Sequence, residues 1–137
     1  MQGNHDNLVA LRDDIFRRKN QIQNEPNHYF SIAFQQGRDA PNEMECTDTF
    51  DLLQKEMSSG KWDVIVADEI VGATSSGLLP ISKVIRLIKE RPAGLDLVLT
   101  GHHAPKKLID LADLVTEMKP IKHPYEKGIL AKQGIDF

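Results

Sequence analysis

The sequence predicts an α/β protein, a three-layer sandwich with a mostly parallel sheet. Strand-like apolar runs alternate with helical patterns along the chain, and the strongest runs are apolar at nearly every position. Continuous apolar character is typical of parallel strands that are covered on both faces. The chain has 137 residues and neither an internal repeat nor a low-complexity linker, so we expect a single domain over residues 1–137.

The amino-terminal region, residues 1–28, is expected to be helical and divergent. Leu8 and Leu11 begin an apolar repeat at helical spacing over residues 7–22, and basic side chains fill the opposite face. Residues 29–34 then form an apolar run that ends at a glycine-containing polar loop. This run predicts the first strand of the sheet.

A helix, a strand and a second helix are expected in the middle of the chain. Thr47 or Asp48 is expected to cap a helix over residues 48–58. Residues 62–67 give the strongest strand signal in the sequence. Pro80 suits the first turn of the next helix, where its missing amide donor is not needed.

The rest of the sequence continues the alternation of strands and helices up to residue 118. Residues 68–77 are expected to form a Gly-rich loop, and residues 95–100 predict another buried strand. A short helix over 105–111 and a strand over 112–118 follow. The last segment, residues 119–137, is basic and glycine-punctuated, and it has little regular pattern.

Composition argues against several classes of function. A formal charge of −3 argues against non-specific nucleic-acid binding, which needs a basic face. No apolar run approaches the roughly 20 residues that cross a bilayer, and nothing resembles a signal peptide. The lone cysteine, Cys46, cannot form an internal disulfide. We therefore expect a cytoplasmic protein in which this thiol is incidental rather than nucleophilic.

Asp68 and Glu69 directly follow the strongest strand and are the most informative pair of side chains. The pattern resembles the Walker B element of P-loop nucleotide-binding proteins, in which a carboxylate at a strand end holds Mg²⁺ against the phosphates. Adjacent strand residues point to opposite faces, so only one acid needs to face a ligand. The alternative is that both acids simply end a buried strand with solvated charge.

Thr100, Gly101, His102 and His103 follow the next strand. A polar loop at this place is expected to border a ligand pocket, because ligands of such folds bind beyond the carboxyl ends of the strands. Neighbouring histidines rarely chelate one zinc ion, and no second pair of ligands accompanies them. An ordinary loop remains the alternative.

Three blocks of the sequence resemble a known family. They are residues 62–70 (WDVIVADEI), 97–101 (LVLTG) and 112–124 (ADLVTEMKPIKHP), and the last continues into residues 127–137 (KGILAKQGIDF). Taken together, these blocks are similar to the ATP:corrinoid adenosyltransferases of the cob(I)yrinic acid a,c-diamide type. The closing segment is the most specific, and the resemblance covers about residues 29–137.

The resemblance implies a RecA-like P-loop fold, usually dimeric, and a transferase of cobalamin biosynthesis or salvage. In that reaction cob(I)alamin attacks the ribose 5′ carbon of ATP and triphosphate leaves. Glu69 falls where the family places its magnesium-contacting carboxylate, with Asp68 beside it, so both are implied to be catalytic. Thr100 and Gly101 fall on the binding loop. The family commonly has arginine where this chain has His102, which is shorter and only partly charged.

The carboxy-terminal segment is the second candidate binding region. It offers a set of basic side chains and glycines, namely Lys119, Lys122, His123, Lys127, Gly128, Lys132 and Gly134. Such a segment could fold over a polyphosphate or over the amide periphery of a corrinoid. The alternative is a solvated basic tail that packs on a neighbour.

The chain also departs from the family. No G-x-x-x-x-G-K-[ST] phosphate-binding loop occurs in the 137 residues, and neither the first strand of the family nor its aromatic segment beside the corrinoid is recognisable. A sheet without that strand would leave buried backbone groups unpaired. We therefore expect the fold to lack its first strand and a homodimer to bury the gap.

Two functions remain open on this reading. The first is an ATP:corrinoid adenosyltransferase that uses Mg²⁺ with ATP and a corrinoid substrate. The second is a degenerate, non-catalytic homologue that binds a corrinoid or a partner protein. The missing phosphate loop favours the second, whereas the retained Glu69 and the tail favour the first. A third possibility, an unrelated α/β protein, conflicts with the closing motif.

Overall fold

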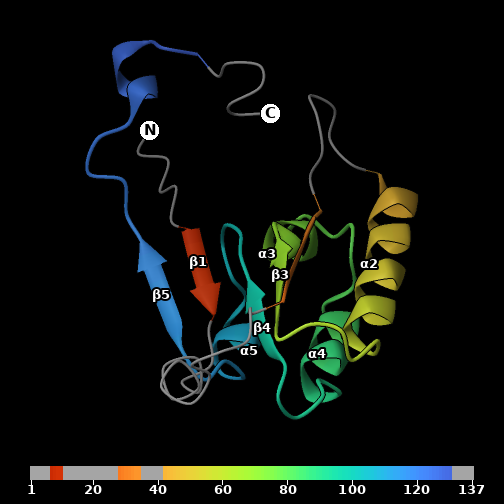
Figure 1. The fold of residues 1–137 in the computed structure, drawn as a ribbon. Coiled ribbons are helices and arrows are strands. Elements are labelled where there is room, and N and C mark those ends of the chain that lie inside the picture. Colours follow the sequence, from red (N-terminus) through yellow and green to blue (C-terminus); the bar gives the residue numbers. More distant parts are fainter. Residues whose placement is uncertain (1–6, 11–27, 35–41, 131–137) are drawn as a thin grey trace.

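A computed structural model describes residues 7–10, 28–34 and 42–130 of the chain. Its strands form a sheet in the order β2-β3-β4-β1-β5 (Figure 1). The strands are β1 (Asn7–Ala10), β2 (Tyr29–Ala33), β3 (Val64–Asp68), β4 (Asp96–Leu99) and β5 (Val115–Met118). The helices are α2 (Glu43–Met57), α3 (Ile70–Ser75), α4 (Ile81–Lys89), α5 (Lys106–Ile109) and the 3-10 helix η1 (Pro124–Lys127). Within the described residues, no helix is long and apolar enough to cross a membrane.

The parallel part of the sheet confirms the fold class that the sequence predicts. Strands β2, β3 and β4 pair in parallel, with Ala67 opposite Leu99 near the carboxyl ends of β3 and β4. Helices connect these strands, as parallel pairing requires, and the architecture is consistent with a three-layer α/β sandwich. All four residues of β4 are buried, as expected of a strand inside a parallel sheet.

Strand β1 differs from the sequence-based expectation. Residues 7–10 were predicted to begin a helix, but they form a strand that runs antiparallel to both neighbours. A short apolar run is compatible with either element, so periodicity alone could not decide between them. Residues 11–22, the rest of that expected helix, lie outside the described residues. Strand β1 lies inside the sheet, between β4 and β5, whereas we expected the absence of a first strand to leave a gap inside the sheet.

Helix α2 begins earlier than the sequence-based prediction. Its cap is Asn42, whose side-chain oxygen accepts a hydrogen bond from the Glu45 amide at 2.9 Å, while the Asn42 amide donates to the Glu45 carboxylate at 3.1 Å. This reciprocal pair satisfies two amides that a helix start leaves without partners. Thr47 lies inside the helix and donates its hydroxyl hydrogen to the Glu43 carbonyl at 2.8 Å, so the prediction of a cap at Thr47 or Asp48 is wrong.

Helix α3 replaces part of the predicted loop over residues 68–77. It spans Ile70–Ser75 and directly follows the two acids at the end of β3. Ile70 and Val71 are buried, and their burial stabilises a helix that is too short to form alone. The other predicted elements lie within one or two residues of α4, β4, α5 and β5 in most places.

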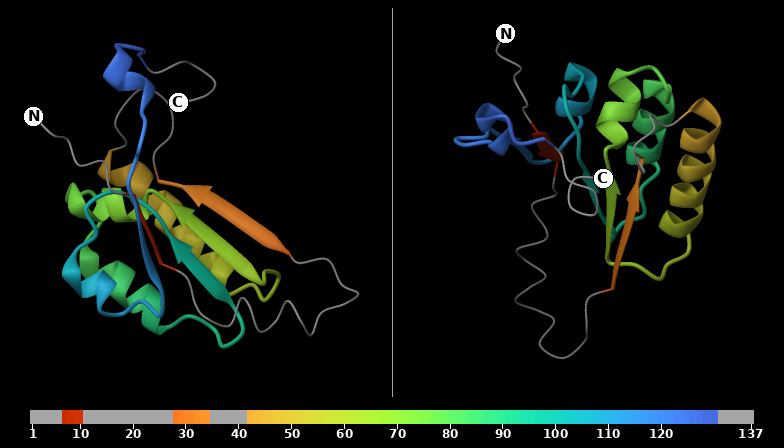
Figure 2. Two further views of the ribbon diagram at one scale, coloured as in Figure 1. Left: turned by 90° about the vertical axis from the view of Figure 1, so that its left-hand side faces the viewer. Right: turned by 90° about the horizontal axis from the view of Figure 1, so that it is seen from above.

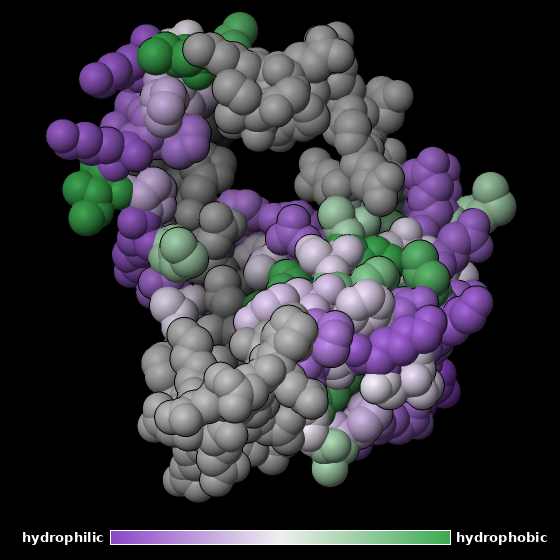
Figure 3. Space-filling model, in the orientation of Figure 1, coloured by the Kyte–Doolittle hydropathy of each residue, from purple (hydrophilic) through white to green (hydrophobic). Residues whose placement is uncertain are grey.

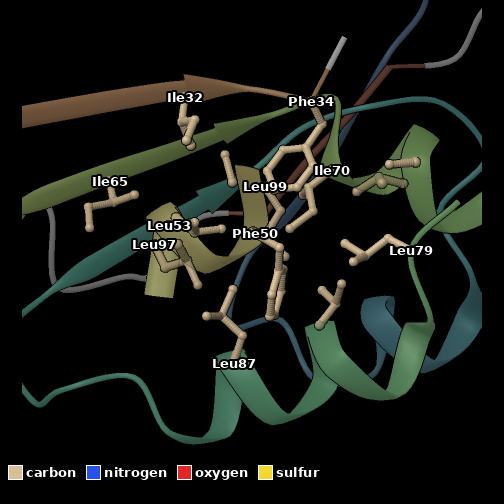
Figure 4. Packing of buried hydrophobic residues seen from close by; sticks show 14 of the residues in the cluster. Ile32, Phe34, Phe50, Leu53, Ile65, Ile70, Leu79, Leu87, Leu97 and Leu99 are labelled. Carbon is tan, nitrogen blue, oxygen red and sulfur yellow. The ribbon is translucent and has the colours of Figure 1, made fainter. Parts of the chain in front are cut away.

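The hydrophobic core lies between the parallel strands and helices α2 and α4 (Figure 4). Phe50 and Leu53 of α2, Ile65 of β3, and Val84 and Leu87 of α4 are each at most 1% exposed. Burial of one such side chain contributes about 1.5–3 kcal/mol. This core fixes the direction of β3 and β4, and therefore the place where their carboxyl ends meet.

Candidate functional site at the carboxyl ends of β3 and β4

The carboxyl ends of β3 and β4 bring four of the predicted site residues together. Asp68 ends β3, and Glu69 follows it at the start of α3. Thr100 and Gly101 follow β4, and the Thr100 amide donates to the Ala67 carbonyl at 3.2 Å. The parallel register thus places the two acids beside the Thr100-Gly101 loop, as the sequence predicts.

The Thr100 hydroxyl links the two acids. It donates its hydrogen to the Asp68 carboxylate at 2.5 Å, and it accepts the backbone N–H of Glu69 at 3.0 Å. The Thr100 carbonyl accepts a further hydrogen bond, from the Val71 amide at 3.1 Å. One residue of the β4 loop therefore bonds to three residues of the β3–α3 connection, at positions 68, 69 and 71.

Glu69 adopts a left-handed backbone conformation, with φ of 59° and ψ of 13°. An L-residue with a Cβ atom pays about 1–2 kcal/mol for this conformation, and glycine or asparagine usually occupies it. The Glu69 side chain is half-buried, and its carboxylate lies over the first turn of α3. A Cβ atom added at Gly72 would lie 2.8 Å from the Glu69 Oε2 atom. Gly72 therefore makes room for this carboxylate.

Gly101 allows the β4 loop to approach α3 closely. Its φ is 142°, and a Cβ atom there would lie 2.7 Å from the Gly72 nitrogen and 2.8 Å from the Val71 Cβ atom. Such distances are shorter than non-bonded atoms tolerate, and the neighbouring atoms belong to backbone or to a buried residue. The contact between Gly72 and Gly101 requires glycine on the β4 side.

The two histidines of the β4 loop diverge in burial. His102 is half-buried, whereas His103 is exposed and has a left-handed φ of 56°. The Ser75 hydroxyl of α3 lies 2.9 Å from both the His103 and the Val71 carbonyl oxygens, which share its one hydrogen, so α3 contacts this part of the β4 loop. Within the described ranges, no three histidine, cysteine, aspartate or glutamate side chains are placed to hold a metal ion.

The acid pair fits a particular kind of cation site. Mg²⁺ commonly takes one or two protein carboxylates and completes its shell with water and substrate phosphates. Asp68 is exposed and Glu69 is half-buried, so both oxygen donors lie at the surface of the fold. Such a pair suits a cation that arrives with a polyphosphate rather than a cation held by protein ligands alone.

The structure does not bring the basic tail residues into packing contact with the acid pair. Residues 119–130 are all exposed. Within this segment the His123 Nδ1 atom accepts the Tyr125 amide hydrogen at 3.1 Å, and Gly128 closes η1 with a φ of 72°. Lys122 and Lys127 are exposed side chains, while Lys132 and Gly134 lie outside the described residues.

The tail nevertheless leaves the sheet on the side of the site. Strand β5 runs in the same direction as β4, so residues 119–130 rise from the end of the sheet at which β3 and β4 also end (Figures 1 and 2). In the space-filling view this segment carries hydrophilic and hydrophobic residues side by side (Figure 3). Its exposed large apolar residues are Ile121, Tyr125, Ile129 and Leu130, and Met118 at the end of β5 is exposed beside them in the sequence.

Two residues of the site were not identified from the sequence. Gly72 and Ser75 both lie in the segment that was predicted to be a loop, and both contact the β4 loop. Their roles depend on a helix whose short length gives little periodic signal. Cys46, by contrast, lies in the core and is 1% exposed. Burial and the Glu45 carboxylate raise the pKa of its thiol, which agrees with a structural rather than a nucleophilic cysteine.

Comparisons with known proteins agree with the blocks noted in the sequence. Residues 10–137 match the model of the family described as ATP:corrinoid adenosyltransferase BtuR/CobO/CobP. A corrinoid adenosyltransferase of Sinorhizobium sp. is 41% identical over 88 residues, which cover 64% of this chain and 39% of the relative.

Two further relatives extend the comparison. A corrinoid adenosyltransferase of Escherichia coli (strain K12) is 27% identical over 92 residues, 67% of this chain and 47% of the relative. An uncharacterised protein of Nostoc sp. is 41% identical over 81 residues, 59% of this chain and 21% of the relative. The chain thus spans less than half the length of these relatives. Because the family match covers nearly the whole sequence, the chain belongs to the ATP:corrinoid adenosyltransferase family.

Proposed function

We propose that the chain acts in the transfer of the adenosyl group of ATP to a corrinoid, cob(I)alamin or cob(I)yrinic acid a,c-diamide, in cobalamin biosynthesis or salvage. The observation that carries the proposal is the pair Asp68 and Glu69, held beside Thr100 at the carboxyl ends of adjacent parallel strands. Ligands of open α/β sheets bind just beyond these carboxyl ends of the strands. Family membership supplies the substrate class.

The acids would act on the nucleotide side of the reaction. Glu69, with Asp68, would hold the Mg²⁺ that accompanies ATP, and the cation would balance charge on the triphosphate as it leaves. In the transfer the corrinoid cobalt forms a bond to the ribose 5′ carbon, and the bond from that carbon to the triphosphate oxygen breaks. Thr100, Gly101 and His102 would border the nucleotide on the β4 side.

The tail would act on the corrinoid side. Lys122, His123, Lys127 and Gly128 lie on a segment that leaves the sheet on the same side as the acids. Lysine and imidazole groups donate hydrogen bonds, and corrinoid side chains carry amide oxygens that accept them. The exposed apolar residues of the segment would supply the non-polar contacts that a corrin ring requires.

The second candidate is a binding module without ATP chemistry. The sequence contains no G-x-x-x-x-G-K-[ST] loop, and that loop normally supplies the backbone amides and the lysine that surround the phosphates. A chain that keeps the tail without this loop would bind a corrinoid or a partner protein and would not turn over.

Calorimetric titration separates the two candidates. The protein is titrated with MgATP and, under anaerobic conditions, with reduced corrinoid, and formation of the adenosylated corrinoid is followed by its absorption spectrum. Turnover supports the transferase. Corrinoid binding without ATP binding supports the module. Binding of neither ligand contradicts the transferase and the corrinoid-binding module, and it leaves binding of a partner protein as the form of the module to test.

We also propose a cytoplasmic homodimer. The lone cysteine suits a reducing compartment, and the apolar side chains on the tail are an exposed surface that association would bury. Light scattering coupled to size exclusion measures the mass in solution. A mass of about 15.4 kDa, that of one chain, would contradict the dimer.

A further inference from the structure

Two strained residues flank the candidate site from opposite sides. Among the described non-glycine residues, Glu69 and His103 have positive φ, at 59° and 56°. Each follows one of two adjacent parallel strands, β3 and β4. Strained backbone persists where the surroundings hold it in place, and such residues gather at functional sites.

The contacts that hold Glu69 in place centre on Thr100. The Glu69 N–H donates to the Thr100 hydroxyl at 3.0 Å, and the same hydroxyl donates to the Asp68 carboxylate at 2.5 Å. A hydroxyl has one hydrogen to donate, and here that hydrogen is directed to Asp68. Its oxygen also accepts the Glu69 amide, so the side chain is engaged with the protein rather than with solvent.

The two hydrogen bonds of the Thr100 hydroxyl are not needed to end strand β3 at the surface. Asp68 is exposed, so water could solvate its carboxylate without Thr100. A loop that only ended β3 would carry glycine or asparagine at position 69, since these residues adopt φ near 60° at lower cost. The chain has glutamate there instead, and the hydroxyl of the half-buried Thr100 accepts the Glu69 amide hydrogen.

We infer that Thr100 is a positioning residue for the proposed cation site, because its hydroxyl fixes the Asp68 carboxylate and the backbone from which the Glu69 side chain projects. The inference rests on the proposed function for its biological meaning. It predicts that the affinity for a divalent cation depends on the presence of a hydroxyl at position 100. Loss of the hydroxyl frees the Asp68 carboxylate to rotate and releases the Glu69 backbone, whereas a hydroxyl on a smaller side chain preserves both bonds.

The test compares Thr100→Val with Thr100→Ser. Valine matches threonine in shape but lacks the hydroxyl, and serine retains the hydroxyl but lacks the methyl group. Thr47→Val is the control, because the Thr47 hydroxyl donates within α2, to the Glu43 carbonyl at 2.8 Å, and lies on a different element from the site. Two quantities are measured, the exchange rate of the Glu69 amide by NMR and the affinity for Mn²⁺ alone by electron paramagnetic resonance.

We expect Thr100→Val to raise the Glu69 exchange rate at least about 10-fold and to weaken Mn²⁺ binding about 10-fold, the scale of a lost hydrogen bond to a charged group. Thr100→Ser should remain within about threefold of the wild type in both quantities, and Thr47→Val should change neither. Unchanged exchange in Thr100→Val would overturn the proposed bonds. A raised Glu69 exchange rate in Thr100→Val with an unchanged Mn²⁺ affinity would overturn the inference, because Thr100 would then stabilise the loop without affecting cation binding.

Mn²⁺ serves as the probe because it separates this inference from the proposed function. If the wild type binds Mn²⁺ and Thr100→Val binds it more weakly, the inference holds whether or not ATP is turned over. If the wild type adenosylates a corrinoid but the variants bind Mn²⁺ equally, the function stands and the inference fails. A wild type that binds no Mn²⁺ also overturns the inference.

Discussion

Replacement of Gly101 by alanine tests the close contact on which the site depends. The added Cβ atom would lie 2.7 Å from the Gly72 nitrogen and 2.8 Å from the Val71 Cβ atom. Backbone at Gly72 cannot rotate away as a long side chain would, so the β4 loop and α3 must separate. The substitution also forces alanine into a positive φ of 142°.

Gly77→Ala is the matched control. Gly77 has a positive φ of 80°, but nothing lies within 4 Å of its added Cβ atom. Alanine there should cost only the conformational penalty of about 1–2 kcal/mol. At Gly101 the steric conflict should add about 1–3 kcal/mol, the usual cost of forcing extra atoms into a packed site.

Urea unfolding measures both variants. Trp62, the single tryptophan of the chain, is half-buried against Phe30, and its Nε1 atom donates to the Glu56 carboxylate at 2.6 Å. Its fluorescence should therefore report the loss of the core. Equal losses of unfolding free energy in Gly101→Ala and Gly77→Ala, at the same dependence on urea, would refute the packing argument.

Three further predictions concern the acids, the tail and the cysteine. Glu69→Gln should weaken Mg-nucleotide binding about 10-fold and leave the urea midpoint nearly unchanged, because glutamine keeps the shape of the side chain but not its charge. Equal nucleotide affinities of the variant and the wild type, measured by calorimetry, would contradict the proposed role of Glu69. Removal of residues 119–137 should reduce corrinoid affinity more than the free energy of unfolding, and an unchanged affinity would exclude the tail from binding. Because burial raises the pKa of the Cys46 thiol above 9.0, the unfolded thiol ionises first. Its contribution to stability is full below about pH 9 and is lost as the pH rises, so the urea midpoint should fall less between pH 8 and pH 10 in Cys46→Ala than in the wild type.

The parallel core could be predicted because its signal is local and strong. Residues 62–67 are apolar at nearly every position, and the structure places β3 there, with Ile65 and Ala67 fully buried. The pairing of β3 with β4 follows from the rule that such strands lie side by side in a sheet. The proximity of Asp68 and Thr100, at the carboxyl ends of neighbouring strands, could therefore be predicted from the sequence.

Other features depend on information that a residue pattern carries weakly. The start of α2 at Glu43 rests on the Asn42 cap, but the first apolar residue of its buried stripe comes later in the sequence. The strand at residues 7–10 was assigned to the helix predicted over residues 7–22, because the apolar repeat of that longer stretch included Leu8 and four residues alone show no period. The left-handed backbone of Glu69 was not predictable, since glutamate rarely adopts it and tertiary contacts impose it.

The way the sheet is assembled separates the two halves of the proposed site. Strand β1 pairs with β5 over all four of its residues, but its described pairing with β4 is at Ala10, opposite Leu99. The tail therefore extends from β5, which pairs with β1, whereas Asp68 and Glu69 are anchored between β3 and β4 through Thr100. A change in the tail should leave the acid pair in place, and a change at Thr100 should leave the tail in place. Nucleotide binding and corrinoid binding are thus expected to fail independently, so a chain that lost one could keep the other.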